Sequence, residues 1–264
     1  NLMKNSTAII INADADEDRR QHMKRMLGRF NVPYRLFSAV QIDRLSQSRI
    51  AQYGSPSVRS ELRAIACSMS HIGAWKDFLE TDLDACMVLE DDVLFSDGFG
   101  EFWDEFSIPD DRCEIWKIES CNATCTVSRK AYFKNSYTSF YQLHSLHAAT
   151  AAYVINRKTA AFLVSVADDF RENIDHELFD PVKRTVPMCR ILQAIPALCI
   201  QDRAYSKTPE FASTIGDNRN PDENLKLIKF RRQFLSPIVT ILASCLMSYQ
   251  GLKRVKIKYL PIVR

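Results

Sequence analysis

The 264-residue chain is predicted to be an α/β protein with a mostly parallel central sheet. Runs of about five apolar residues alternate with longer segments whose apolar residues recur at helical spacing. Residues 85–89 are apolar throughout, as strands are when both faces of a parallel sheet are covered by helices. The first 40 residues also follow the order strand, helix, strand, the usual unit of such folds.

Each predicted element follows from its local pattern. The β-branched residues in 7–11 predict the first strand, and residues 34–40 predict the second. The helix between them, residues 16–30, has acidic residues in its first turn and an apolar face, and Asn31 and Pro33 end it. Further strands are predicted at residues 85–89, 114–118 and 151–155, and further helices at residues 62–79 and 158–166.

Charge divides the chain into two parts. The whole chain has 35 Lys and Arg residues against 32 Asp and Glu, a net charge of +3. Residues 226–264 contain nine basic residues and no acidic ones, so residues 1–225 carry a net charge of −6. We predict a folded domain over residues 1–225, a hinge at residues 216–224 and a basic helical tail over residues 226–264. An acidic body argues against nucleic-acid binding.

The tail is centred on residues 234–249, a stretch without charge that is shorter than a membrane-spanning helix. Basic residues flank it on both sides, which favours binding to an anionic membrane surface. The alternative is a C-terminal helix that packs on the acidic body.

The remaining sequence features indicate a cytoplasmic protein. The apolar run at residues 8–11 is too short for a signal peptide or a membrane span. The eight cysteines contain no C-x-x-C pair and mostly lie in apolar stretches, so we expect buried free thiols in a reducing compartment.

Three consecutive carboxylates, Glu90, Asp91 and Asp92, directly follow the buried run at residues 85–89. Buried carboxylates are costly unless they are paired or bind a metal. The carboxyl ends of the strands are the ligand-binding edge of an open α/β sheet, and clustered carboxylates there suit Mg²⁺ or Mn²⁺. The alternative is a plain acidic turn after a strand.

The stretch from Met87 to Val93, with its Leu-Glu-Asp-Asp core, resembles the signature of glycosyltransferase family 25, the lipooligosaccharide glycosyltransferases. Other segments resemble family motifs in the same order. These are Asn12 to Arg19, Ala39-Val40, the Cys-x-x-Ser-His motif that ends in Ser70-His71, Thr150 to Asn156, Ile174 to Glu177, Pro196 to Gln201 and Ser213-Thr214. The usual Glu before the Cys-x-x-Ser-His motif is Ala64 here.

The resemblance implies a GT-A-type, inverting nucleotide-sugar transferase. It implies metal ligation by Asp92 with Glu90, and a supporting role for Asp91. It also implies that Asn12, Arg19, Ser70 and His71 bind the donor, with Arg19 pairing with a phosphate.

Inversion needs a base that takes the proton of the acceptor hydroxyl. We assign this base to Asp175, with His71 and His176 as alternatives. Asp175 also lies where a helix begins, so it could instead simply cap that helix.

The family resemblance further implies transfer of a hexose, with galactose from UDP-galactose as the first candidate. The implied acceptor is a lipid-linked lipooligosaccharide at the cytoplasmic face of the bacterial inner membrane. Two other hypotheses stay open. The chain could be a non-catalytic carbohydrate- or membrane-binding module that kept the fold, or a glycoside hydrolase that needs neither metal nor nucleotide.

Overall fold

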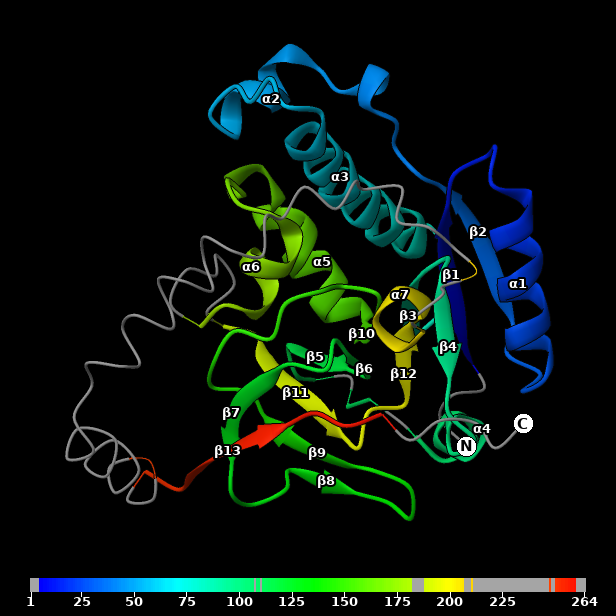
Figure 1. Ribbon diagram of the computed structural model, residues 1–264, viewed down its shortest axis with the longest axis vertical. Coiled ribbons are helices and arrows are strands. Elements are labelled where there is room, and N and C mark those ends of the chain that lie inside the picture. The colour runs from blue at the N-terminus through cyan, green and yellow to red at the C-terminus, as the bar shows by residue number, and fades with distance from the viewer. Residues whose placement is uncertain are drawn as a thin grey trace.

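The computed structural model describes residues 5–106, 108–109, 111–181, 188–206, 210, 247 and 250–259 (Figure 1). The strands of the described chain are β1 (Ser6–Asn12), β2 (Tyr34–Ser38), β3 (Ala85–Glu90), β4 (Val93–Phe95), β5 (Glu114–Lys117), β6 (Glu119–Ser120), β7 (Thr124–Ser128), β8 (Phe133–Lys134), β9 (Ser139–Gln142), β10 (Ala152–Asn156), β11 (Arg190–Ile195), β12 (Cys199–Gln201) and β13 (Leu252–Lys256). The α-helices are α1 (Glu17–Gly28), α2 (Gln47–Gln52), α3 (Arg59–Leu79), α4 (Phe99–Glu105), α5 (Arg157–Val166), α6 (Ile174–Phe179) and α7 (Asp202–Tyr205).

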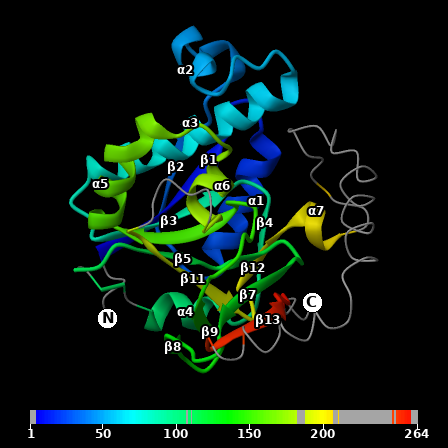
Figure 2. The same cartoon turned by 90° about the vertical axis from the view of Figure 1, so that its left-hand side faces the viewer.

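An eight-stranded sheet in the order β2-β1-β3-β10-β5-β11-β9-β8 forms the middle layer. Alternate residues of β1 enter two separate apolar clusters: Ala8 and Ile10 pack with α1 and α4, whereas Ile9 and Ile11 pack with α3, α5 and α6. Figure 2 shows α3 and α5 on one side of the sheet and α4 on the other. Both faces of the central strands are therefore buried, which explains their uninterrupted apolar sequences and confirms the α/β prediction.

The sheet is mixed, so the prediction of a mostly parallel sheet is wrong. β1 is parallel to β2 and β3, and β5 is parallel to β11, but β10 runs antiparallel to both of its neighbours, β3 and β5. The chain passes from β5 to β10 through the short strands β6 to β9, and the residues described there contain no helix. The helical crossover that usually joins parallel neighbours is absent from this connection.

The strands and helices predicted from local pattern are otherwise confirmed to within a few residues. The predicted helix at residues 62–79 starts three residues earlier, at Arg59, and the strand at residues 85–89 includes Glu90. The short strands of residues 119–142 were not predicted, because two- to five-residue segments carry too little periodicity.

A small second sheet, β4-β12-β6, stands at the carboxyl end of β3. β12 pairs with β4 in antiparallel register, so that Gln201 lies opposite Val93. The backbone N–H of Asp202 also donates to the carbonyl of Asp92, at 2.9 Å. These contacts place Gln201 beside the three consecutive carboxylates, although 109 residues separate it from Asp92.

Residues 252–256 of the predicted helical tail form a strand, β13, whereas Met247 within the uncharged stretch is helical. β13 pairs with β7 in antiparallel register, with Lys253 opposite Val127. Ile257, just beyond β13, is fully buried, and its carbonyl accepts a hydrogen bond from the Ser120 hydroxyl at 2.8 Å. The predicted hinge at residues 216–224 lies outside the described residues, as does the uncharged stretch 234–249 apart from Met247. Among the helices described, none combines the length and apolarity needed to span a bilayer.

Two of the eight cysteines are joined, against the expectation of free thiols. A disulfide links Cys113 to Cys189, which directly precede β5 and β11. Because β5 and β11 are neighbours, with Glu114 opposite Arg190, the two thiols are brought together although they are 76 residues apart in sequence. Five other cysteines within the described ranges are free.

Candidate functional site

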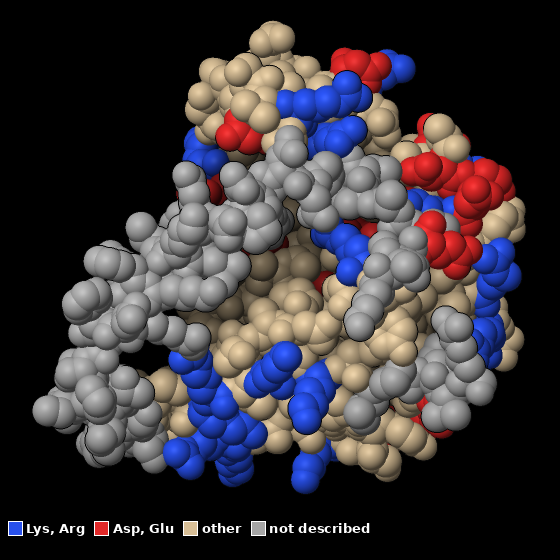
Figure 3. Space-filling model, in the orientation of Figure 1, with Lys and Arg blue, Asp and Glu red and all other residues tan. Residues whose placement is uncertain are grey.

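A cavity of about 850 Å³ opens at the carboxyl ends of β1 and β3, against α3. Figure 3 shows the face that it belongs to, which is hollowed near its centre. Six of the eight predicted site residues line the cavity: Arg19, Ser70, His71, Glu90, Asp91 and Asp92. Asn12 contacts them from behind, and Asp175 is not among the lining residues.

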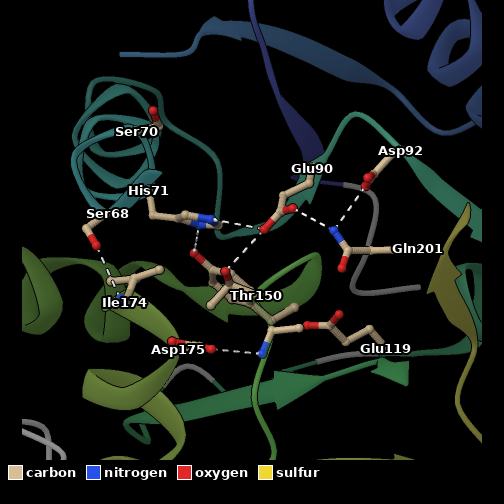
Figure 4. Close-up of polar contacts among 12 residues, drawn as sticks. Ser68, Ser70, His71, Glu90, Asp92, Glu119, Thr150, Ile174, Asp175 and Gln201 are labelled. Atoms are coloured by element: carbon tan, nitrogen blue, oxygen red, sulfur yellow. Dashed lines mark hydrogen bonds and ion pairs between the residues drawn. The ribbon is translucent and has the colours of Figure 1, made fainter. Parts of the chain in front are cut away.

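Glu90, the last residue of β3, is held by contacts from two sides. Its Oε2 accepts a hydrogen bond from the Gln201 amide at 2.8 Å, and its Oε1 accepts one from the Thr150 hydroxyl at 3.2 Å. His71 Nε2 lies 3.8 Å from the same Oε1. In Figure 4, His71 and Gln201 approach the carboxylate from opposite directions. Glu90 is therefore fixed with one oxygen toward α3 and the other toward β12.

Asp91 faces the β1–α1 connection. Its Oδ1 lies 2.6 Å from Arg19 Nη1, and its Oδ2 accepts a hydrogen bond from the Asn12 amide at 2.8 Å. All three residues are buried, with 3–8% of their surface exposed. Both Asp91 oxygens thus join β3 to β1 and α1.

Asp92 is also buried, but its carboxylate has weaker contacts than that of Asp91. Its Oδ1 accepts a 3.2 Å hydrogen bond from the same Gln201 amide that serves Glu90, and its Oδ2 is 3.8 Å from Arg19 Nη1. Burial, together with the charges of Glu90 and Asp91, raises the pKa of Asp92 to about 7. A divalent cation is the partner that such a pair of carboxylates lacks, so Glu90 and Asp92 fit the predicted metal site.

The Ser70-His71 pair lies on the face of α3 that lines the cavity. Ser70 Oγ accepts a hydrogen bond from the Val40 backbone N–H at 2.8 Å, which attaches the segment after β2 to α3. His71 Nδ1 is 2.8 Å from the Tyr153 hydroxyl, and Trp75 Nε1 donates to that same hydroxyl at 2.8 Å. The imidazole is therefore held from behind, with Nε2 directed at Glu90.

Three arginines that we did not predict also line the cavity: Arg59, Arg63 and Arg203. The signal for two of them was present in the sequence, because residues 59, 63, 67 and 71 follow one another at four-residue spacing and so share one face of α3. The face runs from two guanidinium groups near the start of α3 to a thiol and an imidazole beside Glu90. Such cations suit a phosphorylated ligand.

Asp175 lies in the first turn of α6, behind the Thr150 segment as seen from Glu90 (Figure 4). Its Oδ2 accepts a hydrogen bond from the Ala149 backbone N–H at 3.2 Å, and its Oδ1 accepts one from His176 N–H at 2.9 Å. It nevertheless acts on the cavity wall: burial, then the charge of Glu90, then that of Asp175 raise the pKa of the Cys67 thiol.

The fold and the site define an α/β enzyme whose cavity combines buried carboxylates with arginines. Residues 5–178 match the model of glycosyltransferase family 25 (LPS biosynthesis protein), so the chain belongs to this family and is a glycosyltransferase.

Curated relatives agree with this assignment. The chain is 27% identical over 237 residues to the lacto-N-neotetraose biosynthesis glycosyltransferase LgtB of Neisseria meningitidis serogroup B, covering 84% of this chain and 85% of the relative. It is 27% identical over 227 residues to LgtE of Neisseria gonorrhoeae, covering 81% and 80%. A shorter match, 32% identical over 99 residues, is to procollagen galactosyltransferase 1-B of Xenopus laevis and covers 33% of this chain and 16% of the relative.

Proposed function

We propose that the chain is a metal-dependent, inverting hexosyltransferase with a GT-A-type arrangement. It would transfer a hexose, with galactose as the first candidate, from a UDP-hexose to a saccharide of lipooligosaccharide or lipopolysaccharide. The proposal depends on one observation above all: Glu90 and Asp92 lie together at the cavity and share a single amide hydrogen-bond donor, Gln201. The names of the curated relatives support glycosyl transfer as the reaction class, and the family description, LPS biosynthesis protein, supports the acceptor class.

The donor would lie between the carboxylates and the arginines. Glu90 and Asp92 would hold Mn²⁺ or Mg²⁺, which supplies the positive charge that the departing diphosphate needs. Arg19, Arg59, Arg63 and Arg203 line the same cavity and would bind phosphate oxygens. Asp91 would act indirectly, by keeping Arg19 beside Asp92.

We propose Asp175 as the base that takes the proton of the acceptor hydroxyl. Two backbone N–H groups fix the orientation of its carboxylate, and its charge acts on the wall of the cavity at Cys67. The Ala149–Thr150 segment separates Asp175 from Glu90 (Figure 4). An inverting transfer needs the base and the departing diphosphate on opposite sides of the sugar. Since Asp175 does not line the cavity, an acceptor would have to bring its hydroxyl past the Ala149–Thr150 segment to reach this carboxylate.

We also propose that the protein binds the cytoplasmic face of the bacterial inner membrane peripherally, where a lipid-linked acceptor would be carried. Exposed basic residues gather around β13 and the end of β7, as Figure 3 shows in its lower part. They are Arg129, Lys130, Arg254, Lys256 and Lys258, and we call them the β13 basic surface. Such a cluster suits anionic lipid headgroups.

Ligand-induced thermal stabilisation tests the transferase proposal. A ligand that binds the folded state at about 100 times its Kd stabilises the protein by about 2.7 kcal/mol. We expect UDP with Mn²⁺ or Mg²⁺ to raise Tm by several degrees, and UDP with a chelator to do so much less. The metal-dependent part is the difference in Tm between UDP with metal and UDP with a chelator. If Asp92→Asn loses this difference, the Asp92 carboxylate is needed for metal binding.

The alternative function, a non-catalytic carbohydrate- or membrane-binding module, predicts a different result. Such a protein would show no response to UDP, GDP or CDP with either metal, while a saccharide could still stabilise it. Absence of any nucleotide response would therefore overturn the transferase proposal.

A further inference from the structure

Cys67, His71 and Glu90 bring three different ligand types to one point of the cavity wall. Cys67 and His71 are one turn apart on α3, and Glu90 ends β3. The thiol sulfur, an imidazole nitrogen and a carboxylate oxygen all lie within 4.8 Å of one another. All three residues line the cavity, so a ligand can reach them from it.

Among the residues that the structure describes, the His71 nitrogen that faces this point has no hydrogen-bond partner. The side chain is fully buried, and Nε2 lies 3.8 Å from Glu90 Oε1, beyond hydrogen-bonding distance. A buried nitrogen without a partner destabilises the folded state unless a ligand satisfies it.

The rest of the imidazole is arranged as it is in metal sites. Metal-bound histidines almost always use their second nitrogen for a hydrogen bond that fixes the ring. Here Nδ1 is bonded to the Tyr153 hydroxyl, which Trp75 holds in turn. A phenol oxygen can accept from both Trp75 and His71, which leaves the Nε2 lone pair free for a metal.

We propose that Cys67 Sγ, His71 Nε2 and Glu90 Oε1 form a binding site for a Zn²⁺-type metal ion, with the fourth position open to the cavity. Thiolate, imidazole and carboxylate are the ligands of zinc, and three protein ligands with one open position are typical of its reactive sites. On binding, the Cys67 thiol releases its proton to solvent and the imidazole binds in its neutral form. Zinc–ligand bonds of about 2.0–2.3 Å require ligand atoms within roughly 4 Å of one another, so the side chains close in slightly.

This site differs from the proposed Glu90–Asp92 site in its chemistry and in the oxygen it uses. The second oxygen of Glu90, Oε2, faces Gln201 and Asp92, whereas Oε1 faces His71. Oxygen ligands alone suit Mg²⁺ or Mn²⁺, and the thiolate selects a softer ion. One consequence rests on the proposed function: Zn²⁺ would inhibit transfer because it binds the same glutamate.

Cobalt spectroscopy tests the site without any assay of transfer. Titration of the full-length protein with Co²⁺ should give a thiolate-to-cobalt charge-transfer band in the near ultraviolet and the strong visible bands of tetrahedral Co²⁺, and Zn²⁺ should remove both. Cys67→Ser should lose the charge-transfer band and weaken Zn²⁺ binding about 100-fold or more. Tyr153→Phe should weaken it about 10–100-fold, as changes to such supporting hydrogen bonds do.

Cys121→Ser is the matched control. Cys121 is half-buried and lies 3.4 Å from a histidine nitrogen, that of His147, but it does not line the cavity. This variant should keep the cobalt spectrum of the wild type. A wild-type spectrum without the charge-transfer band, or one that Cys67→Ser leaves unchanged, would overturn the proposal.

A labelling experiment on the wild-type chain covers the case in which Cys67→Ser does not fold. The rate of alkylation at each cysteine is measured by mass spectrometry. Zn²⁺ should slow the alkylation of Cys67 and leave the rate at Cys121 unchanged. Equal rates at Cys67 with and without Zn²⁺ would contradict the site. Neither measurement uses a nucleotide, so a failed transferase proposal would be recognised separately by its missing response to UDP.

Discussion

Three consecutive carboxylates have three different environments in this protein. Glu90 is held by hydrogen bonds from Thr150 and Gln201, and Asp91 by Arg19 and Asn12. Within the described part of the chain, Asp92 has one 3.2 Å hydrogen bond, from Gln201, and a guanidinium 3.8 Å away, that of Arg19. The difference separates Asp91 from Asp92, because the Asp91 carboxylate is already paired with a buried guanidinium, whereas the Asp92 carboxylate is available to a ligand.

The first prediction compares Asp91→Asn with Asp92→Asn. Removing the Asp91 charge leaves buried Arg19 without its 2.6 Å carboxylate partner, so we expect a loss of about 3 kcal/mol in the free energy of unfolding. The pKa of Asp92 is raised to about 7, so its ionised form costs the folded state free energy as pH rises through 7. Asp92→Asn should therefore be as stable as the wild type at pH 8 without metal, or more so.

Urea unfolding at pH 8 with a chelator present measures both values. Asp92→Asn should stay folded and lose the metal-dependent response to UDP. The main effect of Asp91→Asn should instead be a lower free energy of unfolding. Equal losses of stability in the two variants would contradict this division of roles.

The second prediction concerns the proposed base. Asparagine at position 175 keeps an oxygen that can accept the hydrogen bond from Ala149, but it cannot take a proton. We expect Asp175→Asn to lower kcat by a factor of about 10²–10⁴ with donor binding unchanged. The measurement is steady-state transfer alongside UDP-induced stabilisation, and wild-type turnover would move the base to another residue.

Among single residues, the sequence predicted those that a local pattern marks. The carboxylates were found because they directly follow a buried strand. Local pattern also marks Gln201 as a polar residue after an apolar run, but it does not show that Gln201 meets Asp92, because the two are 109 residues apart and are brought together by the pairing of β12 with β4. The weak compensation of Asp92 is also a property of the fold, since sequence alone does not say which of three neighbouring acids meets Arg19.

The sequence predicted which segments are helices and which are strands, but not the direction in which each strand runs in the sheet. Apolar periodicity located β1, α1, β3, α3, β10 and α5 to within a few residues. The antiparallel direction of β10 depends on how the chain returns from β5 through residues 118–151, where the short strands give little signal. The pairing of β13 with β7 likewise joins segments more than 100 residues apart.

The third prediction tests whether the end of the tail is part of the fold. Ile257 is fully buried in the cluster that contains Cys125 and Val127 of β7. We expect Ile257→Ala to lower the free energy of unfolding by about 2–4 kcal/mol, because it leaves a cavity in a packed core. Lys258→Ala, at an exposed neighbouring position, should change it by less than about 0.5 kcal/mol. Similar values for the two variants in urea unfolding would show that the segment at Ile257, just beyond β13, does not stabilise the fold.

Over the whole molecule, the near-neutral net charge hides an uneven distribution. The first 225 residues carry −6 and the last 39 carry +9. Because β13 pairs with β7, tail charges are fixed on the folded body beside Arg129 and Lys130. Figure 3 shows acidic side chains gathered on the other side of the same face, near α1. A protein with this polarity is expected to turn one side toward an anionic surface.

The last prediction tests this orientation with a triple variant, Arg254→Gln, Lys256→Gln and Lys258→Gln, whose three positions are all exposed. Substitution is preferable to deletion here, since deletion would also remove buried Ile257. Each basic residue near an anionic leaflet contributes about 1 kcal/mol of binding free energy, so the variant should bind phosphatidylserine-containing vesicles about 100-fold more weakly. Vesicle co-sedimentation at fixed ionic strength measures this, and neutral vesicles should show no difference.

A second triple variant controls for the change in net charge. Arg25→Gln, Arg29→Gln and Arg44→Gln also remove three exposed positive charges, but outside the β13 basic surface. If the position of the charges matters, the control should bind anionic vesicles nearly as well as the wild type, and both variants should keep their UDP-induced stabilisation. Equal weakening in the two variants would mean that net charge alone drives binding, and it would remove the β13 basic surface as the side that meets the membrane.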